Sequence, residues 1–189
     1  MDAKIVLYTD GACRGNERGA ENIGAWAYYL AFVKNGVTVN EKKDSQPIRN
    51  TTNNRMEIRA VIEGLRAIKD KQSYPIEVYS DSTYVVYGIA KWCEKWVRDG
   101  WCKVKKQKKV LIKNADLWKE LYVLKKECRM IMFIEVRGHS GNTHNEYVDS
   151  LCNYAMDNCK ECECDTIDTV DVSADLQQSF ENFEEEGEI

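Results

Sequence analysis

Four acidic residues in this 189-residue sequence stand where carboxylates could act together. Asp10 and Asp81 each end a short run of β-forming residues, KIVLYTD and IEVYSD. Glu57 lies on the apolar face of a predicted helix, because the residues four, seven and eleven places on are Val, Gly and Ile. Asp149 borders the apolar stripe of the last predicted helix. Carboxylates directed toward a core are costly unless they are paired or bind metal.

Taken singly, each of these carboxylates has a structural explanation as an N-cap, a turn residue or part of a solvated face. Four that converge without matching arginines would repel one another, and a hard divalent cation removes that repulsion. Ligation by oxygen alone suits Mg²⁺ or Mn²⁺. Two such ions about 4 Å apart are the usual arrangement for displacement at a phosphodiester.

An α/β domain is needed to bring the four together. The predicted strands are residues 4–10, 24–33, 37–43, 76–81 and 131–136. The predicted helices are residues 51–69, 82–98, 114–128 and 145–158, and we expect the second to break near Gly88. The first and fourth strands are separated by a helix, so a right-handed crossover can make them parallel neighbours. Asp10 and Asp81 would then emerge at the same carboxyl edge of the sheet.

The charge is unevenly distributed along the chain. The net charge is −4, yet residues 91–113 hold nine basic and two acidic residues, and residues 157–189 hold twelve acidic residues and one lysine. The longest uncharged apolar run, residues 23–33, is too short to span a bilayer. Residues 1–10 lack the pattern of a signal peptide. We therefore expect a cytoplasmic protein without a membrane partner, and a polyanion as the partner of the basic segment.

The eight cysteines then predict reduced thiols rather than a disulfide framework. The cluster Cys152, Cys159, Cys162 and Cys164 lacks the second ligand pair that a zinc site needs, so free thiols are favoured. A redox-sensitive disulfide within the cluster stays open.

With these residues in view, the sequence resembles type 1 ribonuclease H of the bacterial kind. The matching motifs run in order over residues 4–156. They are YTDGA at 8–12, TTNNRME at 51–57, YSDSTYV at 79–85, NADLW at 114–118, VRGHSGN at 136–142 and NEYVD at 145–149. Each motif is weak alone, but the ordered set is specific.

The resemblance implies an RNase H-like fold, a five-stranded mixed sheet of order 3-2-1-4-5 flanked by helices, over residues 1–158. It implies endonucleolytic cleavage of the RNA strand of RNA–DNA hybrids, giving 5′-phosphate and 3′-hydroxyl ends. Two Mg²⁺ ions, for which Mn²⁺ can substitute, would be held by Asp10, Glu57, Asp81 and Asp149. One ion would activate the attacking water and the other would stabilise the leaving 3′ oxygen.

His139 matches a histidine of a mobile loop that assists proton movement or product release. Without the resemblance it is one of two histidines, between Gly138 and Gly141, and an ordinary surface-loop histidine is an equal interpretation.

The resemblance also assigns substrate contacts to the residues of this sequence that match the family's motifs. The RNA strand, distinguished by its 2′-hydroxyls, would be met by Asn16, Asn53, Asn54 and the backbone near Cys13 and Gly15. Thr52 matches a phosphate pocket for the DNA strand, although turn and cap chemistry explains these residue types too. Residues 91–113 resemble a basic protrusion that binds the DNA strand. Its candidate contacts are Trp92, Lys103, Lys105, Lys106, Lys108 and Lys109, and we expect the tryptophans mainly to pack.

Residues 159–189 are predicted to form an acidic tail. Leu176, Phe180 and Phe183 follow a helical spacing, so a short amphipathic helix could dock a replication or repair protein or compete for the basic protrusion. A solubilising tail is the simpler explanation. We expect a monomer.

Three alternatives to a free-standing ribonuclease H remain for the function. They are a ribonuclease H domain of reverse-transcriptase origin, a related two-metal nuclease, and a non-catalytic hybrid-binding module.

Overall fold

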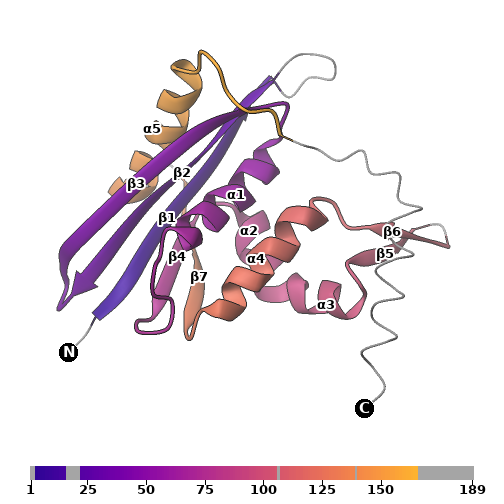
Figure 1. The fold of residues 1–189 in the computed structure, drawn as a ribbon, viewed down its shortest axis with the longest axis horizontal. Helices are drawn as coiled ribbons and strands as arrows, with labels where there is room; N and C mark the ends of the chain where they lie inside the picture. Colours follow the sequence, from indigo (N-terminus) through magenta and orange to yellow (C-terminus); the bar gives the residue numbers. More distant parts are fainter. Residues whose placement is uncertain (1–2, 16–21, 106, 139, 166–189) are drawn as a thin grey trace.

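The computed structural model describes residues 3–15, 22–105, 107–138 and 140–165. A five-stranded sheet of order β3-β2-β1-β4-β7 forms its centre (Figure 1). β1, β2 and β3 are antiparallel, and β4 and β7 run parallel to β1. The strands are β1 Ala3–Arg14, β2 Ile23–Lys34, β3 Val37–Arg49, β4 Ile76–Ser80 and β7 Ile131–Glu135. The predicted mixed sheet is confirmed, since β7 is the fifth predicted strand.

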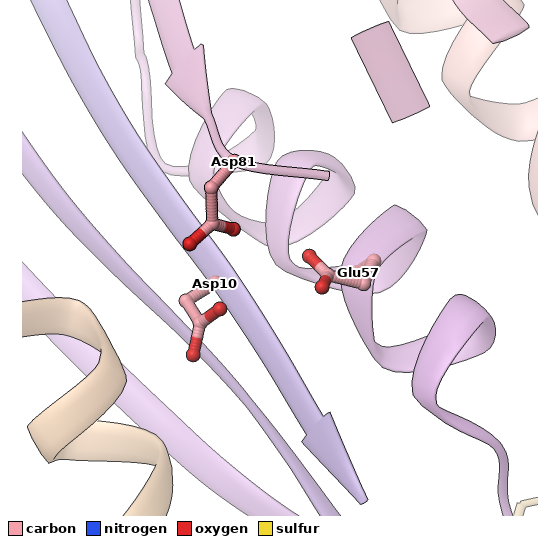
Figure 2. A group of neighbouring side chains, drawn as sticks. All are labelled: Asp10, Glu57 and Asp81. Atoms are coloured by element: carbon pink, nitrogen blue, oxygen red, sulfur yellow. The ribbon is translucent and has the colours of Figure 1, made fainter. Parts of the chain in front are cut away.

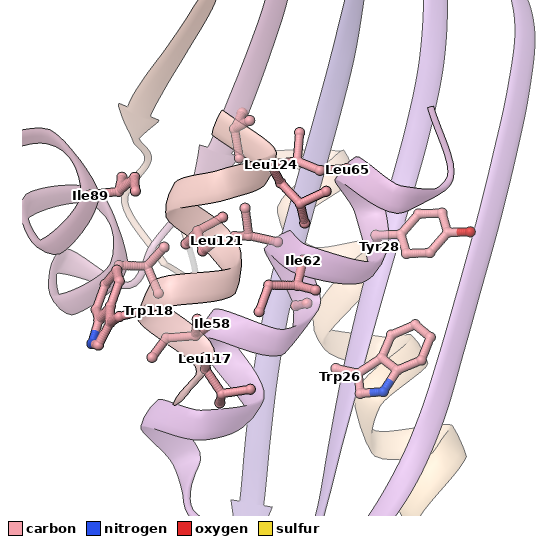
Figure 3. Packing of buried hydrophobic residues seen from close by; sticks show 14 of the residues in the cluster. Trp26, Tyr28, Ile58, Ile62, Leu65, Ile89, Leu117, Trp118, Leu121 and Leu124 are labelled. Carbon is pink, nitrogen blue, oxygen red and sulfur yellow. The ribbon is translucent and has the colours of Figure 1, made fainter. Parts of the chain in front are cut away.

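Helices cover both faces of this sheet (Figure 1). α1 (Asn53–Arg66) and α4 (Ala115–Glu127) pack on one face, and α5 (Thr143–Asp157) packs on the other. The alternation along β2 fits these two faces, because Trp26 and Tyr28 point toward α1 while Ala25 and Ala27 leave room for α5. Figure 3 shows the larger core, where apolar side chains of α1 and α4 interdigitate. None of the helices in the described ranges is long and apolar enough to cross a membrane.

The helix predicted over residues 82–98 is divided into three pieces. They are α2 (Thr83–Tyr87), a π-helical turn (Gly88–Trp92) and α3 (Cys93–Arg98). A Cβ at Gly88 would lie 2.2 Å from the ring of Trp118, so glycine allows α4 to approach here. The predicted break near Gly88 is confirmed.

The basic segment contains a hairpin that sequence patterns did not predict. β5 (Cys102–Lys105) and β6 (Lys108–Leu111) form a separate two-stranded sheet that stands off the main body beyond α3 (Figure 1). Gln107 in its turn has φ 65°. The density of lysines concealed the strands, because four of their eight residues are exposed lysines.

The chain continues to pack on the body past residue 158, as far as Asp165. Cys164 forms a parallel bridge with Arg49 at the end of β3. The side chain of Asp165 is fully buried and accepts hydrogen bonds from Thr51 Oγ1 and Arg55 Nε, both at 2.7 Å. An acidic residue can be buried here because a buried arginine offsets its charge. The predicted amphipathic helix and the rest of the tail, residues 166–189, lie outside the described residues.

The cysteine prediction needs one correction. Free thiols were favoured for this cluster, but Cys159 and Cys162 are joined by a disulfide, the alternative that the sequence left open. Two residues separate these cysteines in the turn after α5, and this close spacing brings the two sulfurs together. The expectation of free thiols rested on the predicted reducing compartment and not on this spacing. Cys164 and Cys152 remain free, and Cys152 is buried, where its thiol donates to the backbone oxygen of Asp10 at 3.3 Å.

Candidate active site

Strand pairing places the two aspartates side by side. β1 and β4 pair in parallel from Ile5 with Ile76 to Tyr8 with Tyr79, a constant offset of 71 residues. Asp81 directly follows the last residue of β4, and the same offset, carried two residues further, places Asp10 beside it. The expectation that the first strand ends at Asp10 was wrong, because residues 10–14 go on pairing with β2 and β1 continues to Arg14. Figure 2 shows Asp10 within β1 and Asp81 on the segment that follows β4, with the two carboxylates close together.

Glu57 completes the group from α1. A Cβ built on Gly11 would lie 2.1 Å from the backbone nitrogen of Glu57, so only glycine lets the helix approach β1 this closely. The carboxylate of Glu57 therefore faces the two aspartates (Figure 2). One oxygen from each of Asp10, Glu57 and Asp81 lies within 4.8 Å of the others. The sequence prediction that Glu57 points toward the sheet is confirmed.

The electrostatics of this cluster are unfavourable without a cation. Burial raises the pKa of Asp10 to about 6, and the charges of Asp81 and Asp149 add to the effect. Burial, with the charges of Asp10 and Asp81, raises the pKa of Glu57 well above its ordinary value. Asn53 donates to Oε1 of Glu57 at 3.4 Å, while the buried Oε2 has no hydrogen-bond partner among the described residues.

The carboxylates open into a cleft of about 220 Å³. Its lining residues are Asp10, Gly11, Ala12, Asn53, Glu57, Asp81, Asn145, Glu146 and Asp149. This described lining contains carboxylate and amide oxygens and no lysine or arginine. An oxygen-only, electron-rich set with an orphaned buried oxygen fits a hard divalent cation.

Asp149 shares the cleft but lies outside the tight group of three. It is half-buried on α5, and its Oδ1 accepts from Asn153 Nδ2 at 3.1 Å. The structure thus brings three of the four predicted carboxylates into one cluster and places the fourth on the same cleft.

Asn145 is a site residue to which sequence reasoning assigned no role. It is 2% exposed and donates from Nδ2 to Oδ2 of Asp81 at 2.9 Å, while its own buried Oδ1 has no partner within the described part of the chain. The sequence could have indicated this role, because Asn145 lies four residues before Asp149 and the two therefore share one face of α5. Its contact orients the carboxylate of Asp81.

His139 lies outside the described residues, but the loop leading to it begins against the site. A Cβ built at Gly138 would lie 3.0 Å from Oδ2 of Asp81. The prediction for His139 therefore stays a prediction, on a loop whose start adjoins the carboxylates.

The predicted contacts with substrate strands gather at the start of α1. Thr52 occupies the N-cap position, yet its side chain makes no capping hydrogen bond and its buried Oγ1 has no partner in the described ranges. The capping hydrogen bond expected of Thr52 is therefore absent. Cys13 and Gly15 lie at the end of β1, and Asn16 lies outside the described residues.

The lysines of the hairpin are presented to solvent. The side chains of Lys103, Lys105, Lys108 and Lys109 are exposed, and Lys106 lies outside the described residues. Trp96 packs on Trp118 with ring centroids 5.3 Å apart, and Trp92 remains 41% exposed. The expectation that the tryptophans support the protrusion fits this packing.

Comparison with known proteins gives a consistent result. The family model described as RNase H matches residues 2–157. A ribonuclease H of Clostridium botulinum is 43% identical over 156 residues, covering 82% of this chain and 96% of that protein. A ribonuclease HI of Rickettsia conorii is 41% identical over 152 residues, covering 80% and 90%. The crystal structure of LC9-RNase H1, a type 1 RNase H with the type 2 active-site motif, matches with TM-score 0.66 and 31% identity, covering 81% of this chain and 72% of that chain.

Proposed function

The chain belongs to the ribonuclease H family, and we propose on this premise that Asp10, Glu57 and Asp81 form its catalytic centre. The enzyme hydrolyses the RNA strand of RNA–DNA hybrids as an endonuclease. The observation that carries the assignment of residues is the cluster that the buried Asp10 and Glu57 form with the half-buried Asp81, where β4 ends beside β1.

Metal binding is the natural use of this cluster. We propose two Mg²⁺ ions, with Mn²⁺ as a substitute, held by Asp10, Glu57 and Asp81 with Asp149 from the rim. Bound divalent cations supply an acidified water molecule and stabilisation of the charge that develops on the leaving 3′ oxygen. The support is the oxygen-only lining of the cleft and the buried oxygen of Glu57 without a partner.

Other residues of the protein hold these carboxylates in position and orient them. Asn145 fixes the carboxylate of Asp81 by its hydrogen bond of 2.9 Å. Gly11 lets α1 rest on β1 and so sets the position of Glu57. His139 would take up or deliver a proton during the reaction, because imidazole is the side chain best suited to proton transfer near neutral pH.

The hybrid would lie across the start of α1 and the hairpin. Asn53, Asn54 and the end of β1 would meet the RNA strand with neutral groups, which bind sugar and phosphate without adding charge beside the metals. Thr52 and the exposed hairpin lysines would hold the phosphates of the DNA strand.

One assay tests this function. Labelled RNA–DNA hybrid, duplex DNA and duplex RNA are incubated with the protein, with Mg²⁺ or with EDTA. We expect cleavage of the RNA strand of the hybrid alone, only with metal, leaving 5′-phosphate ends. Binding without cleavage would identify a hybrid-binding module, and cleavage of another duplex would identify a different nuclease.

Replacing His139 tests the proton-transfer assignment. His139→Ala should lower turnover about 10–100-fold, at or below the ~10²–10⁴ typical of acid–base groups. The affinity for hybrid should barely change, because the ring is not expected to hold the substrate. His144→Ala is the matched control, since His144 is exposed and stacks on Tyr29. Unchanged turnover in His139→Ala would return it to the surface-loop interpretation.

Replacing hairpin lysines tests the DNA-strand contact. The variant with Lys105, Lys106, Lys108 and Lys109 changed to Ala should bind hybrids of any sequence more weakly. Its log–log salt slope should flatten by about 0.9 for each phosphate that the variant no longer neutralises, because fewer counterions are released. Turnover at saturating substrate should largely survive. The control changes four exposed lysines outside the hairpin: Lys34, Lys69, Lys119 and Lys160. A variant with the parent's slope would show that the hairpin does not touch phosphate.

We further propose that the enzyme acts as a monomer in the cytoplasm. Six of the eight cysteines are free thiols, as a reducing compartment favours, whereas the Cys159–Cys162 disulfide is not expected to persist there.

For the acidic tail we propose either docking to a replication or repair protein or competition for the hairpin. If it competes, deleting residues 166–189 should tighten hybrid binding most at low salt, where attraction is least screened. Equal affinities of the full-length and shortened proteins at low salt would exclude competition.

A further inference from the structure

The side-chain amide of Asn22 forms hydrogen bonds with both the backbone N–H and the backbone C=O of a single residue, Thr51. Its Oδ1 accepts from the backbone N–H of Thr51 at 2.8 Å, and its Nδ2 donates to the backbone oxygen of Thr51 at 2.9 Å. The backbone oxygen of Asn22 also accepts from the N–H of Asn50 at 3.0 Å. Three hydrogen bonds therefore tie the segment entering β2 to the segment that joins β3 to α1.

Thr51 is held on its remaining sides as well. It is fully buried, its hydroxyl donates to Asp165, and its backbone oxygen also accepts from the thiol of Cys13 at 3.8 Å. A residue fixed in this way cannot shift without breaking several bonds. The next three residues are Thr52, Asn53 and Asn54, which begin α1.

The clasp formed by Asn22 and Thr51 therefore lies between two sets of proposed substrate contacts. On one side lie Cys13 at the end of β1 and Gly15 just past it, whose backbone is assigned to the RNA strand. On the other side lie Thr52, assigned to a phosphate of the DNA strand, and Asn53 and Asn54, assigned to the RNA strand. A hybrid is distinguished by its shape, so the spacing between contacts to its two strands must be defined.

We propose that Asn22 is a positioning residue that sets the spacing of these two segments and thereby the affinity and selectivity for hybrid. This inference rests on the proposed function. An asparagine suits the role because its amide offers one acceptor and one donor, which match the N–H and C=O of a single backbone residue. Asn22 is not among the residues lining the cleft, so it should act on substrate binding and not on the chemical step.

The experiment compares three variants with the parent. Asn22→Ala removes both side-chain bonds of the clasp. Asn22→Asp keeps the acceptor for the N–H of Thr51 but turns a carboxylate oxygen toward the backbone oxygen of Thr51. Asn40→Ala is the matched control, because Asn40 is exposed on β3. The kcat and KM for hybrid are measured well below each Tm. The Kd for hybrid and for duplex RNA is measured in the presence of Asp10→Asn, which prevents cleavage.

For both Asn22 variants we expect KM and the hybrid Kd to rise about tenfold, because the contacts to the hybrid would no longer be held at the spacing that it requires. The kcat should stay within about twofold of the parent, as expected when binding to substrate and transition state weakens equally. The ratio of duplex-RNA Kd to hybrid Kd should fall, while Asn40→Ala matches the parent in every value.

Variants that unfold at lower temperature but keep the parent's KM and selectivity would overturn the proposal, leaving Asn22 as a purely structural residue. If Asn22→Ala does not fold, the KM, the Kd and the selectivity of Asn22→Asp test the proposal instead. A parent protein that does not cleave hybrid would instead contradict the proposed function itself, so the two failures are distinguishable.

Discussion

Asp10→Asn should abolish metal-dependent cleavage and, at the same time, stabilise the metal-free protein. The kcat should fall by more than about 10³-fold, because stabilisation of transition-state charge by bound metal is worth several kcal/mol and each 1.36 kcal/mol is tenfold. Glu57→Gln and Asp81→Asn should behave alike, since all three carboxylates share one cluster. Asp149→Asn should be milder, because Asp149 lies outside the cluster and an amide still offers an oxygen.

The gain in stability follows from the raised pKa of Asp10. In the folded protein this pKa is about 6, against a usual value of 3.8. Between these values the folded state binds more protons than the unfolded state, so the free energy of unfolding falls as the pH rises through this window. Asn carries no charge and avoids this loss. The Tm of Asp10→Asn in EDTA should therefore exceed that of the parent above pH 6, and the difference should shrink toward pH 4.

Calorimetry in EDTA across pH 4–8 measures the expected gain in stability, and a hybrid-cleavage assay measures the expected loss of activity. Asp99→Asn is the control, because Asp99 is exposed and distant from the cleft lining. Strong activity in Asp10→Asn would refute the metal assignment. A lower Tm than the parent at pH 7.5 would refute the account of the electrostatics.

Asp165→Ala should produce the largest loss of stability. Arg55 has a side chain only 5% exposed and bonds to Asp165 through Nε and to the half-exposed Asp116. Removing one partner of a buried ion pair costs about 3–5 kcal/mol, because the remaining charge stays buried and only partly compensated. The hydroxyl of Thr51 would lose its acceptor as well. Urea unfolding measures the effect.

The pH dependence of this interaction has the opposite sign. Although burial alone would raise it, hydrogen bonds from Arg55 and Thr51 hold the pKa of Asp165 below its usual value. The contribution of Asp165 is therefore present above pH 4 and is lost as the pH falls through the lowered pKa. The stability difference between parent and Asp165→Ala should shrink in acid.

Glu163→Ala is the matched control, since Glu163 is an exposed acidic residue two places away. Deletion of residues 159–189 should destabilise as Asp165→Ala does, whereas deletion of residues 166–189 should not. A stable protein that lacks residues 159–189 would contradict the anchoring of this segment. For the same reason, the function of the tail must be tested with the deletion that retains Asp165.

The sequence alone determined the parts of this protein that depend on local order. Two strand-forming runs that contain Asp10 and precede Asp81, with an intervening helix, dictate a parallel pair that brings the two carboxylates together. The sequence did not show that β1 continues past Asp10 to Arg14. The helical period places Glu57 on the apolar face and so toward that edge. The concentration of lysine in residues 91–113 predicted an exposed basic element without revealing that it is a hairpin.

Only the tertiary structure decided which polar residues act through distant partners. Asn22 and Thr51 are 29 residues apart, Asn145 and Asp81 are 64 apart, and Arg55 and Asp165 are 110 apart. No local period relates such pairs, and an aspartate within an acidic segment looks solvated until its arginine is known. Burial gives these hydrogen bonds and ion pairs their importance, because a buried polar group that loses its partner is costly. Their burial arises only when the sheet and helices pack.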